Sequence, residues 1–243
     1  MKSDQEWKYW GAADPLFAVA SWEGKQAGGR NAWTPEEFLA LGRSDVADVA
    51  KHWRHYGLTE GCCVEIGCGA GRMTNALLSI FQDIDALDVS PDQIATAKKL
   101  LGDKAARVRF HLVDHPAIPL PDGSCDAMFS THVFQHFSDY SAIVAYLKET
   151  FRVLRPGSSL CFHIPVPGAH LTSPASRPRR IASRLKIRVK RILGMRRVME
   201  YHRYPADRVL RTLGEVGFSS GELRIFPMTS NGDYHSFFFA RKA

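Results

Sequence analysis

Long apolar runs are missing from this chain of 243 residues. No stretch approaches the roughly 18 consecutive apolar residues that suggest a membrane-spanning helix, so we expect no such helix. The first residues, Met1 to Glu6, also lack the apolar core of a secretory signal. These two absences predict a cytoplasmic protein.

Cysteine is scarce as well, with five residues in the chain. Most of them fall in apolar stretches that we expect to be strands, where reduced cysteine packs as a small apolar side chain. None has the spacing of zinc ligands, so the sequence predicts a reduced protein with no metal site. The five are Cys62, Cys63, Cys68, Cys125 and Cys161.

What the chain does contain is a glycine-rich turn between a predicted strand and a predicted helix. Residues 64–72 combine an apolar run, the acid Glu65 and three glycines on alternate positions, and residues 73–81 read as a helix. Glycine lets the backbone approach a ligand closely, and a helix start offers free N–H groups. The pattern predicts a site for a nucleotide-like cofactor. A dinucleotide fingerprint would place its third glycine one residue later, where Arg72 stands.

Acidic residues close the next two predicted strands. Residues 84–89 indicate a strand with Asp88 at its end, and Ser90 and Pro91 then suit the start of a helix. A carboxylate at the end of this second strand can accept hydrogen bonds from both hydroxyls of a ribose. Residues 108–113 indicate a third strand that is followed by Asp114, whose carboxylate can accept from an adenine amine.

Further predicted strands alternate with helices, whereas the last two predicted strands follow each other with only a turn between them. We expect strands over 126–129 and 159–164, a late helix over 205–217, and two strands over 222–226 and 236–240 joined by a turn. Alternating strands and helices predict an α/β fold with a doubly wound, mostly parallel sheet. The last two strands favour an antiparallel hairpin at the edge of that sheet.

In this order, the motifs resemble those of the class I S-adenosylmethionine-dependent methyltransferases over roughly residues 60–165. The matching segments are Glu65–Gly71, Asp88–Pro91, Val113-Asp114, Asp126 with His132–Phe137, and Leu154–Gly157. The resemblance implies a Rossmann-like, seven-stranded sheet with an antiparallel C-terminal hairpin strand. It also implies S-adenosylmethionine as cofactor and S-adenosylhomocysteine as product.

The resemblance implies a set of cofactor contacts as well. Asp88 would bind the ribose, Asp114 and His115 the adenine, and the glycines would lie near the methionine and ribose. Glu65 would brace the glycine turn or reach the methionine ammonium group. The full set is Glu65, Gly67, Cys68, Gly69, Gly71, Asp88, Val89, Asp114, His115, Ser130 and Thr131.

A hydroxyl acceptor needs a base, and histidine is the side chain best suited to that role near neutral pH. His132 and His136 follow the fourth predicted strand and are our candidates for catalysis, the alternative being that they are structural histidines. His235 has no argument in its favour from the sequence. Further candidates for contact with the substrate are His163, Tyr201, His202 and Tyr204.

The first 60 residues hold all five tryptophans of the chain. Thr34 and Pro35 suit a helix start. We expect residues 1–60 to form an aromatic-rich helical cap on a methyltransferase domain of residues 61–243. The tryptophans either pack in a core or wall a substrate pocket.

A basic insertion spans residues 170–203, which contain eleven lysines and arginines and a single acid, Glu200. Apolar residues recur on one helical face between Ile181 and Ile192, which predicts a basic amphipathic helix. Three interpretations stay open: a solvated lid, a collar for an acidic substrate, and a contact of residues 177–197 with an anionic membrane surface. The third would make the protein peripheral to the inner face of the membrane.

Together these patterns predict transfer of a methyl group to a small-molecule, glycan or lipid-linked acceptor, at an oxygen such as a sugar hydroxyl. A nucleic-acid substrate is the weaker expectation, because no RNA-binding module accompanies the basic insertion and no Asn-Pro-Pro-aromatic motif follows the fourth strand. Two alternatives remain: an RNA or protein methyltransferase that docks through the insertion, and a non-catalytic scaffold that binds the cofactor. The sequence carries no signal for the oligomeric state.

Overall fold

The computed structural model describes residues 2–114, 116–167 and 201–243, which form one seven-stranded sheet with the order β3-β2-β1-β4-β5-β7-β6. Strand β7 is antiparallel to both of its neighbours, and the other paired strands are parallel. This confirms the predicted sheet with its antiparallel C-terminal hairpin. The strands are β1 Cys62–Ile66, β2 Asp83–Asp88, β3 Val108–Leu112, β4 Cys125–Ser130, β5 Leu154–His163, β6 Phe218–Pro227 and β7 Tyr234–Lys242.

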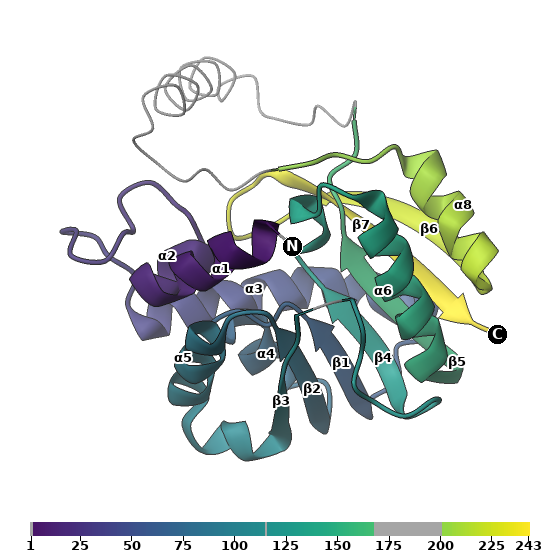
Figure 1. The fold of residues 1–243 in the computed structure, drawn as a ribbon, viewed down its shortest axis with the longest axis horizontal. Helices are drawn as coiled ribbons and strands as arrows, with labels where there is room; N and C mark the ends of the chain where they lie inside the picture. Colours follow the sequence, from purple (N-terminus) through teal and green to yellow (C-terminus); the bar gives the residue numbers. More distant parts are fainter. Residues whose placement is uncertain (1, 115, 168–200) are drawn as a thin grey trace.

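Helices cover both faces of the sheet, as a doubly wound fold requires (Figure 1). Apolar side chains of α3, α4 and α5 share one buried cluster with one face of the strands, and those of α6 and α8 share a second cluster with the other face. The larger helices are α1 Lys2–Ala13, α3 Pro35–Trp53, α5 Pro91–Leu101, α6 Tyr140–Val153 and α8 Ala206–Val216. The shorter ones are α2 Pro15–Val19, η1 Arg54–Tyr56, α4 Arg72–Leu77, η2 Gly102–Arg107 and η3 Phe134–His136.

Three predicted boundaries are wrong by four or five residues, and one of them is the start of β6, which lies at Phe218 rather than at residue 222. Strand β5 begins at Leu154, five residues before the expected start, because Leu154 already pairs with Cys125 across an irregular register. The segment 155–157 therefore lies inside the strand, although its Pro156-Gly157 pair is a sequence signal for a turn. Helix α4 ends at Leu77 rather than at Phe81, and three residues of turn follow it.

The N-terminal region is helical, but its longest helix belongs to the main core. Thr34 and Glu37 form a capping box at the start of α3, with Pro35 in the first turn. At the other end of α3, the buried Trp53 donates a hydrogen bond from Nε1 to Ser159 Oγ of β5 at 2.9 Å. A domain boundary at residue 60 stays a proposal.

Helices α3 and α4 approach each other closely at Gly42. A Cβ atom added there would lie 2.1 Å from the backbone oxygen of Arg72. We predict that Gly42→Ala lowers the free energy of unfolding by about 1–3 kcal/mol, because the backbone of α4 must shift to admit the methyl group. Chemical denaturation of the variant measures the change.

The matched control is Gly214→Ala in α8, where no atom lies within 4 Å of the added Cβ. This change should raise the free energy of unfolding by about 0.5–1 kcal/mol, because alanine loses less backbone entropy in a helix than glycine does. Equal effects at the two positions would contradict the tight packing at Gly42.

Among the residues that the structure describes, no helix has the length and apolar character needed to cross a membrane. The predicted basic amphipathic helix falls almost entirely within residues 168–200, outside the described residues.

Candidate active site

The glycine turn after β1 is fixed to the end of β2 by backbone hydrogen bonds. The N–H groups of Gly67 and Cys68 both donate to the Leu87 oxygen, at 2.8 and 2.9 Å. The Gly69 N–H donates to Asp88 Oδ2 at 2.8 Å. Gly67 and Gly69 have φ values of 76° and 51°, in the left-handed region that favours glycine. The turn therefore depends on both the glycines and the carboxylate of Asp88.

Two valine side chains lie directly against this turn. A Cβ atom on Gly67 would lie 2.2 Å from Val133 Cγ2, and one on Gly69 would lie 2.7 Å from Val19 Cγ2. Val19 belongs to α2 and Val133 to the loop after β4. Gly71 packs against α5, where an added Cβ would lie 3.1 Å from Ala97 Cβ, and its predicted contact with the ligand stays a prediction.

Asp88 joins the glycine turn to the start of α5. Its Oδ1 atom accepts a hydrogen bond from the Ser90 N–H at 2.9 Å, and its Oδ2 atom accepts the one from Gly69. Burial raises the pKa of the Asp88 carboxyl above its ordinary value. Each carboxylate oxygen has a second lone pair, so both can also accept from ribose hydroxyls.

A cavity of about 310 Å³ adjoins the carboxyl ends of the strands. The glycine turn and the end of β2 supply Gly67, Gly69, Asp88 and Val89, and the loop after β4 supplies Thr131, His132, Val133 and His136. The N-terminal helices supply Asp4, Trp7 and Val19. The loop between β6 and β7 supplies Asn231, and the start of β7 supplies His235. Residues far apart in the sequence therefore meet at one concave site.

A smaller cavity of about 40 Å³ adjoins the first and shares Gly67, Asp88 and Val89 with it. Val113 and Asp114 at the end of β3 contribute to its wall. The predicted adenine contact Asp114 and the predicted cofactor residue Val89 therefore lie together here. His115 lies outside the described residues.

Three predicted cofactor residues are buried in or beside the glycine turn and line neither cavity. Ser130 is buried, and its Oγ donates to the Ile66 oxygen at 2.9 Å. Cys68 is buried, which raises the pKa of its thiol well above the ordinary value. Glu65 is 2% exposed and accepts a hydrogen bond from Thr74 Oγ1 at 2.6 Å. The structure thus places Glu65 as a brace between β1 and α4.

Burial raises the pKa of Glu65 to about 7. Because the pKa is higher in the folded state than the unfolded value of 4.5, the folded protein loses stability as the pH rises between 4.5 and about 7. We predict that Glu65→Gln, which mimics the protonated form, flattens this dependence and raises the free energy of unfolding at pH 8 by up to about 3 kcal/mol. Urea denaturation at pH 5 and pH 8 measures both effects, and parallel pH curves for variant and parent would contradict them.

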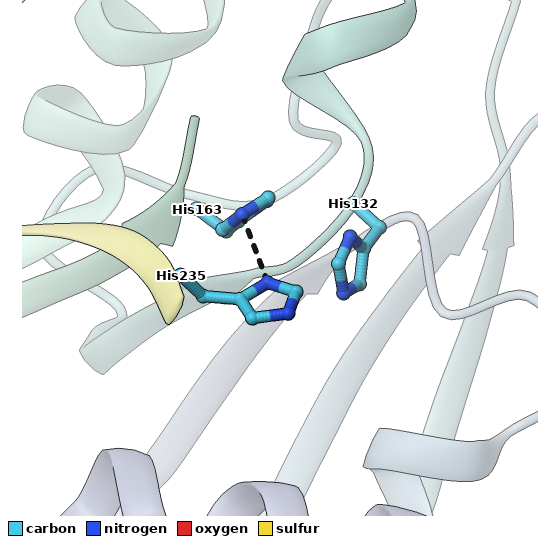
Figure 2. A group of neighbouring side chains, drawn as sticks. All are labelled: His132, His163 and His235. Carbon is cyan, nitrogen blue, oxygen red and sulfur yellow. Dashed lines mark hydrogen bonds between the residues drawn. The ribbon is translucent and has the colours of Figure 1, made fainter. Parts of the chain in front are cut away.

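Three histidine rings meet at the side of the larger cavity (Figure 2). The ring centroids of His132 and His163 are 4.5 Å apart. The ring centroid of His235 lies 5.3 Å from that of His132 and 5.2 Å from that of His163. Burial lowers the pKa of each of the three rings, so each is uncharged near neutral pH. An uncharged imidazole keeps one nitrogen lone pair, which can accept a proton or bind a ligand.

The sequence analysis missed His235, and only strand pairing could have found it. His163 pairs with Phe237 in the β5–β7 ladder, and His235 lies two residues before Phe237 in β7. Residues two apart in a strand point to the same face, so the ladder brings His235 beside His163.

The other predicted substrate residues form the border of the site. His136 lines the cavity, and its ring meets the edge of Trp7 with centroids 4.9 Å apart. The buried Tyr204 donates from its hydroxyl to the Phe137 oxygen. Tyr201 is exposed.

His202 belongs to the same border. Its backbone N–H donates to the Gln135 oxygen at 2.7 Å. None of Tyr201, His202 and Tyr204 lines the larger cavity. The hydrogen bonds of His202 and Tyr204 attach residues 202–204 to the segment that follows β4.

A buried ion pair that the sequence analysis did not anticipate also borders the cavity. Arg72 Nη1 donates to Asp45 Oδ2, and the two residues are 4% and 5% exposed. Arg72 is the first residue of α4 and Asp45 lies in α3. The pair therefore connects the glycine turn to the N-terminal region.

Comparison with known proteins agrees with this geometry. Residues 64–162 match a family model described as a methyltransferase domain. Residues 64–162 therefore form a methyltransferase domain, and the fold is shared with solved S-adenosylmethionine-dependent methyltransferases. The magnesium protoporphyrin IX methyltransferase of Synechocystis, solved with bound S-adenosylhomocysteine, superposes over 99% of this chain and 100% of its own with a TM-score of 0.64 and 14% identity.

Curated relatives of this methyltransferase domain differ in what they methylate. The malonyl-[acyl-carrier protein] O-methyltransferase of Paenibacillus is 37% identical over 109 residues, which are 43% of this chain and 38% of the relative. The mouse N-terminal Xaa-Pro-Lys N-methyltransferase 1 is 35% identical over 100 residues, 39% of this chain and 43% of the relative. The chain spans less than half the length of these relatives.

Proposed function

We propose that the protein transfers a methyl group from S-adenosylmethionine to a small-molecule or lipid-linked acceptor, at an oxygen such as a sugar hydroxyl. The observation that carries this proposal is a single cavity that joins Asp88 and the glycine turn to uncharged histidines. One end has the groups to bind a nucleoside, and the other has groups that can take up a proton.

The residues present fit the cofactor. Asp88 retains lone pairs for the ribose hydroxyls, and Asp114 and Val89 lie at the adjoining small cavity, where they would contact the edge of an adenine ring. Thr131 supports the fit independently, because its buried Oγ1 atom has no hydrogen-bond partner in the described part of the chain although the residue lines the larger cavity. A polar group of the methionine portion would satisfy it.

When bound, S-adenosylmethionine supplies an activated methyl group. The residues of this chain then have three tasks: to hold the acceptor oxygen in line with that group, to exclude water, and to take the hydroxyl proton. Trp7 and Val19 of the N-terminal helices close one side of the cavity. His132 and His136 are the candidates for the proton acceptor.

The position of the cavity favours a small acceptor over a folded macromolecule. Its walls come from α1, α2 and the C-terminal hairpin as well as from the sheet, so an acceptor must enter between them. The basic residues 177–197 would contact an acidic part of the acceptor or an anionic membrane surface. A protein or RNA acceptor docked on that segment is the competing hypothesis.

Mass spectrometry of cell extract incubated with the protein and methyl-labelled S-adenosylmethionine tests the proposal. We expect label in a small-molecule, glycan or lipid fraction, at an oxygen. Label in RNA or protein would overturn the proposed class of acceptor. Calorimetric binding of the cofactor with no labelled product in any fraction would instead support a scaffold.

A further inference from the structure

We propose that His132, His163 and His235 bind one divalent transition-metal ion, of which Zn²⁺ is the probe we choose, beside the larger cavity. The sequence analysis predicts no metal because none of the five cysteines has the spacing of zinc ligands. The fold, however, brings together histidines from three separate segments of the chain (Figure 2). The site is inferred from geometry, and its role below rests on the proposed function.

The distances suit a tetrahedral ion. Ligand nitrogens of the three rings all lie within 4.8 Å of one another, and His163 Nε2 lies 3.3 Å from His235 Nδ1. Zinc–nitrogen bonds of about 2.0–2.1 Å in a tetrahedron place the nitrogens roughly 3.3 Å apart. Rings that point at one such ion would have centroids roughly 5.2 Å apart, and the observed separations are 4.5, 5.2 and 5.3 Å.

A hydrogen bond between two histidines does not account for the whole cluster. It joins His163 Nε2 to His235 Nδ1 and leaves out His132, whose ring centroid lies 4.5 Å from that of His163. The backbone of His132 has a φ of 58°, a left-handed conformation that is uncommon outside glycine. Such strain persists where the surroundings require it, and functional sites are where it gathers.

The ion would keep an open position toward the cavity. His132 and His235 line the cavity, whereas the buried His163 closes the inner side. Three protein ligands with a free fourth position are typical of catalytic rather than structural zinc sites. The Arg72 guanidinium on the same cavity is neutralised by Asp45, so this arginine presents no unpaired positive charge to the ion.

A second group of ligand atoms in the described residues is a weaker candidate. Cys62, Asp85 and Cys125 also lie within 4.8 Å of one another. The Asp85 carboxylate is already bound by Arg109 at 2.6 and 2.8 Å and by His111 at 2.8 Å. Because these partners use the carboxylate that would neutralise an ion, this group serves as the control.

In the proposed reaction, the acceptor oxygen occupies the open position, which lowers the pKa of the hydroxyl. The hydroxyl proton passes to His136, which lines the same cavity. The C–O bond then forms as the C–S bond of the sulfonium breaks, and the electron pair of that bond stays on sulfur. The charge of the ion does not change.

Calorimetric titration of the chelator-treated full chain with Zn²⁺ tests the site. We expect one ion per chain, and a loss of affinity of about 100-fold or more in His163→Asn and in His235→Asn. The cysteine control pair Cys62→Ser with Cys125→Ser, and the exposed His55→Asn, should bind as the parent does. Circular dichroism checks that each variant is folded. If His163→Asn does not fold, His132→Gln takes its place in the test.

Three results would overturn the site: no Zn²⁺ binding by the parent, unchanged binding in all three histidine variants, or loss of binding in the cysteine control. Cofactor affinity is measured on the same proteins and should stay within a few-fold of the parent. This separates the two proposals, because failure of Zn²⁺ binding with intact cofactor binding rejects the metal alone. Methyl transfer that survives chelation would overturn the catalytic role of the ion.

Discussion

Replacing Asp88 with alanine should lower the affinity for S-adenosylmethionine by about two orders of magnitude. The carboxylate would lose its bonds to two ribose hydroxyls, and hydrogen bonds to a charged group contribute about 1.5–3 kcal/mol each. The same change leaves the Gly69 and Ser90 N–H groups without their acceptor, so the glycine turn also loses its anchor to β2. Isothermal calorimetry with the cofactor measures the loss.

The matched control is Asp92→Ala, because Asp92 is an exposed acid of the first turn of α5. Like Asp88→Ala, this variant loses one negative charge, but Asp92 does not line the cavity. Its affinity for S-adenosylmethionine should therefore match that of the parent. Asp88→Asn keeps the shape of the side chain and should bind better than Asp88→Ala. Equal affinity in the parent and in Asp88→Ala would show that the second strand does not bind the ribose.

The parts of this site that the sequence could predict are those whose signals are local. Asp88 stands at the end of an apolar run and directly before a helix start, so its position follows from a few neighbouring residues. The same holds for the glycine turn and for Asp114. In each case the carboxyl end of a parallel strand faces the ligand edge of the sheet.

The parts that the sequence could not predict depend on how distant segments pair. His235 reaches the cavity only because β7 inserts between β5 and β6, which fixes its register against His163. The start of β5 likewise depends on pairing with Cys125 rather than on local turn signals at residues 155–157. Such positions become predictable once the order of the strands is known.

The N-terminal tryptophans, which the sequence analysis grouped together by composition, lie in two different environments in the structure. Trp53 is buried in the core beneath the sheet, whereas Trp7 and Trp22 line the cavity. The sequence analysis left packing and contact with a substrate open; Trp53 packs in the core, and contact of Trp7 and Trp22 with a substrate stays a prediction. Packing of Val19 on Gly69 further ties this region to the cofactor turn.

The second large effect is expected from the ion pair of Arg72 and Asp45. Asp45→Leu should lower the free energy of unfolding by about 3–5 kcal/mol, because it leaves a guanidinium buried without its counter-charge. The pair is also incompletely satisfied, since Asp45 Oδ1 and Arg72 Nε are buried and have no partner in the described ranges. Replacing both residues with apolar ones therefore should recover most of that loss.

Denaturant unfolding of Asp45→Leu, Arg72→Met and the double variant measures the coupling of the two residues. A double variant as unstable as the sum of the single ones would contradict a mutual ion pair. Because both side chains border the cavity, the cofactor affinity of the double variant adds a second result. Restored stability with restored affinity would make the pair a structural link between α3 and the glycine turn, whereas restored stability with lost affinity would assign Arg72 to ligand binding.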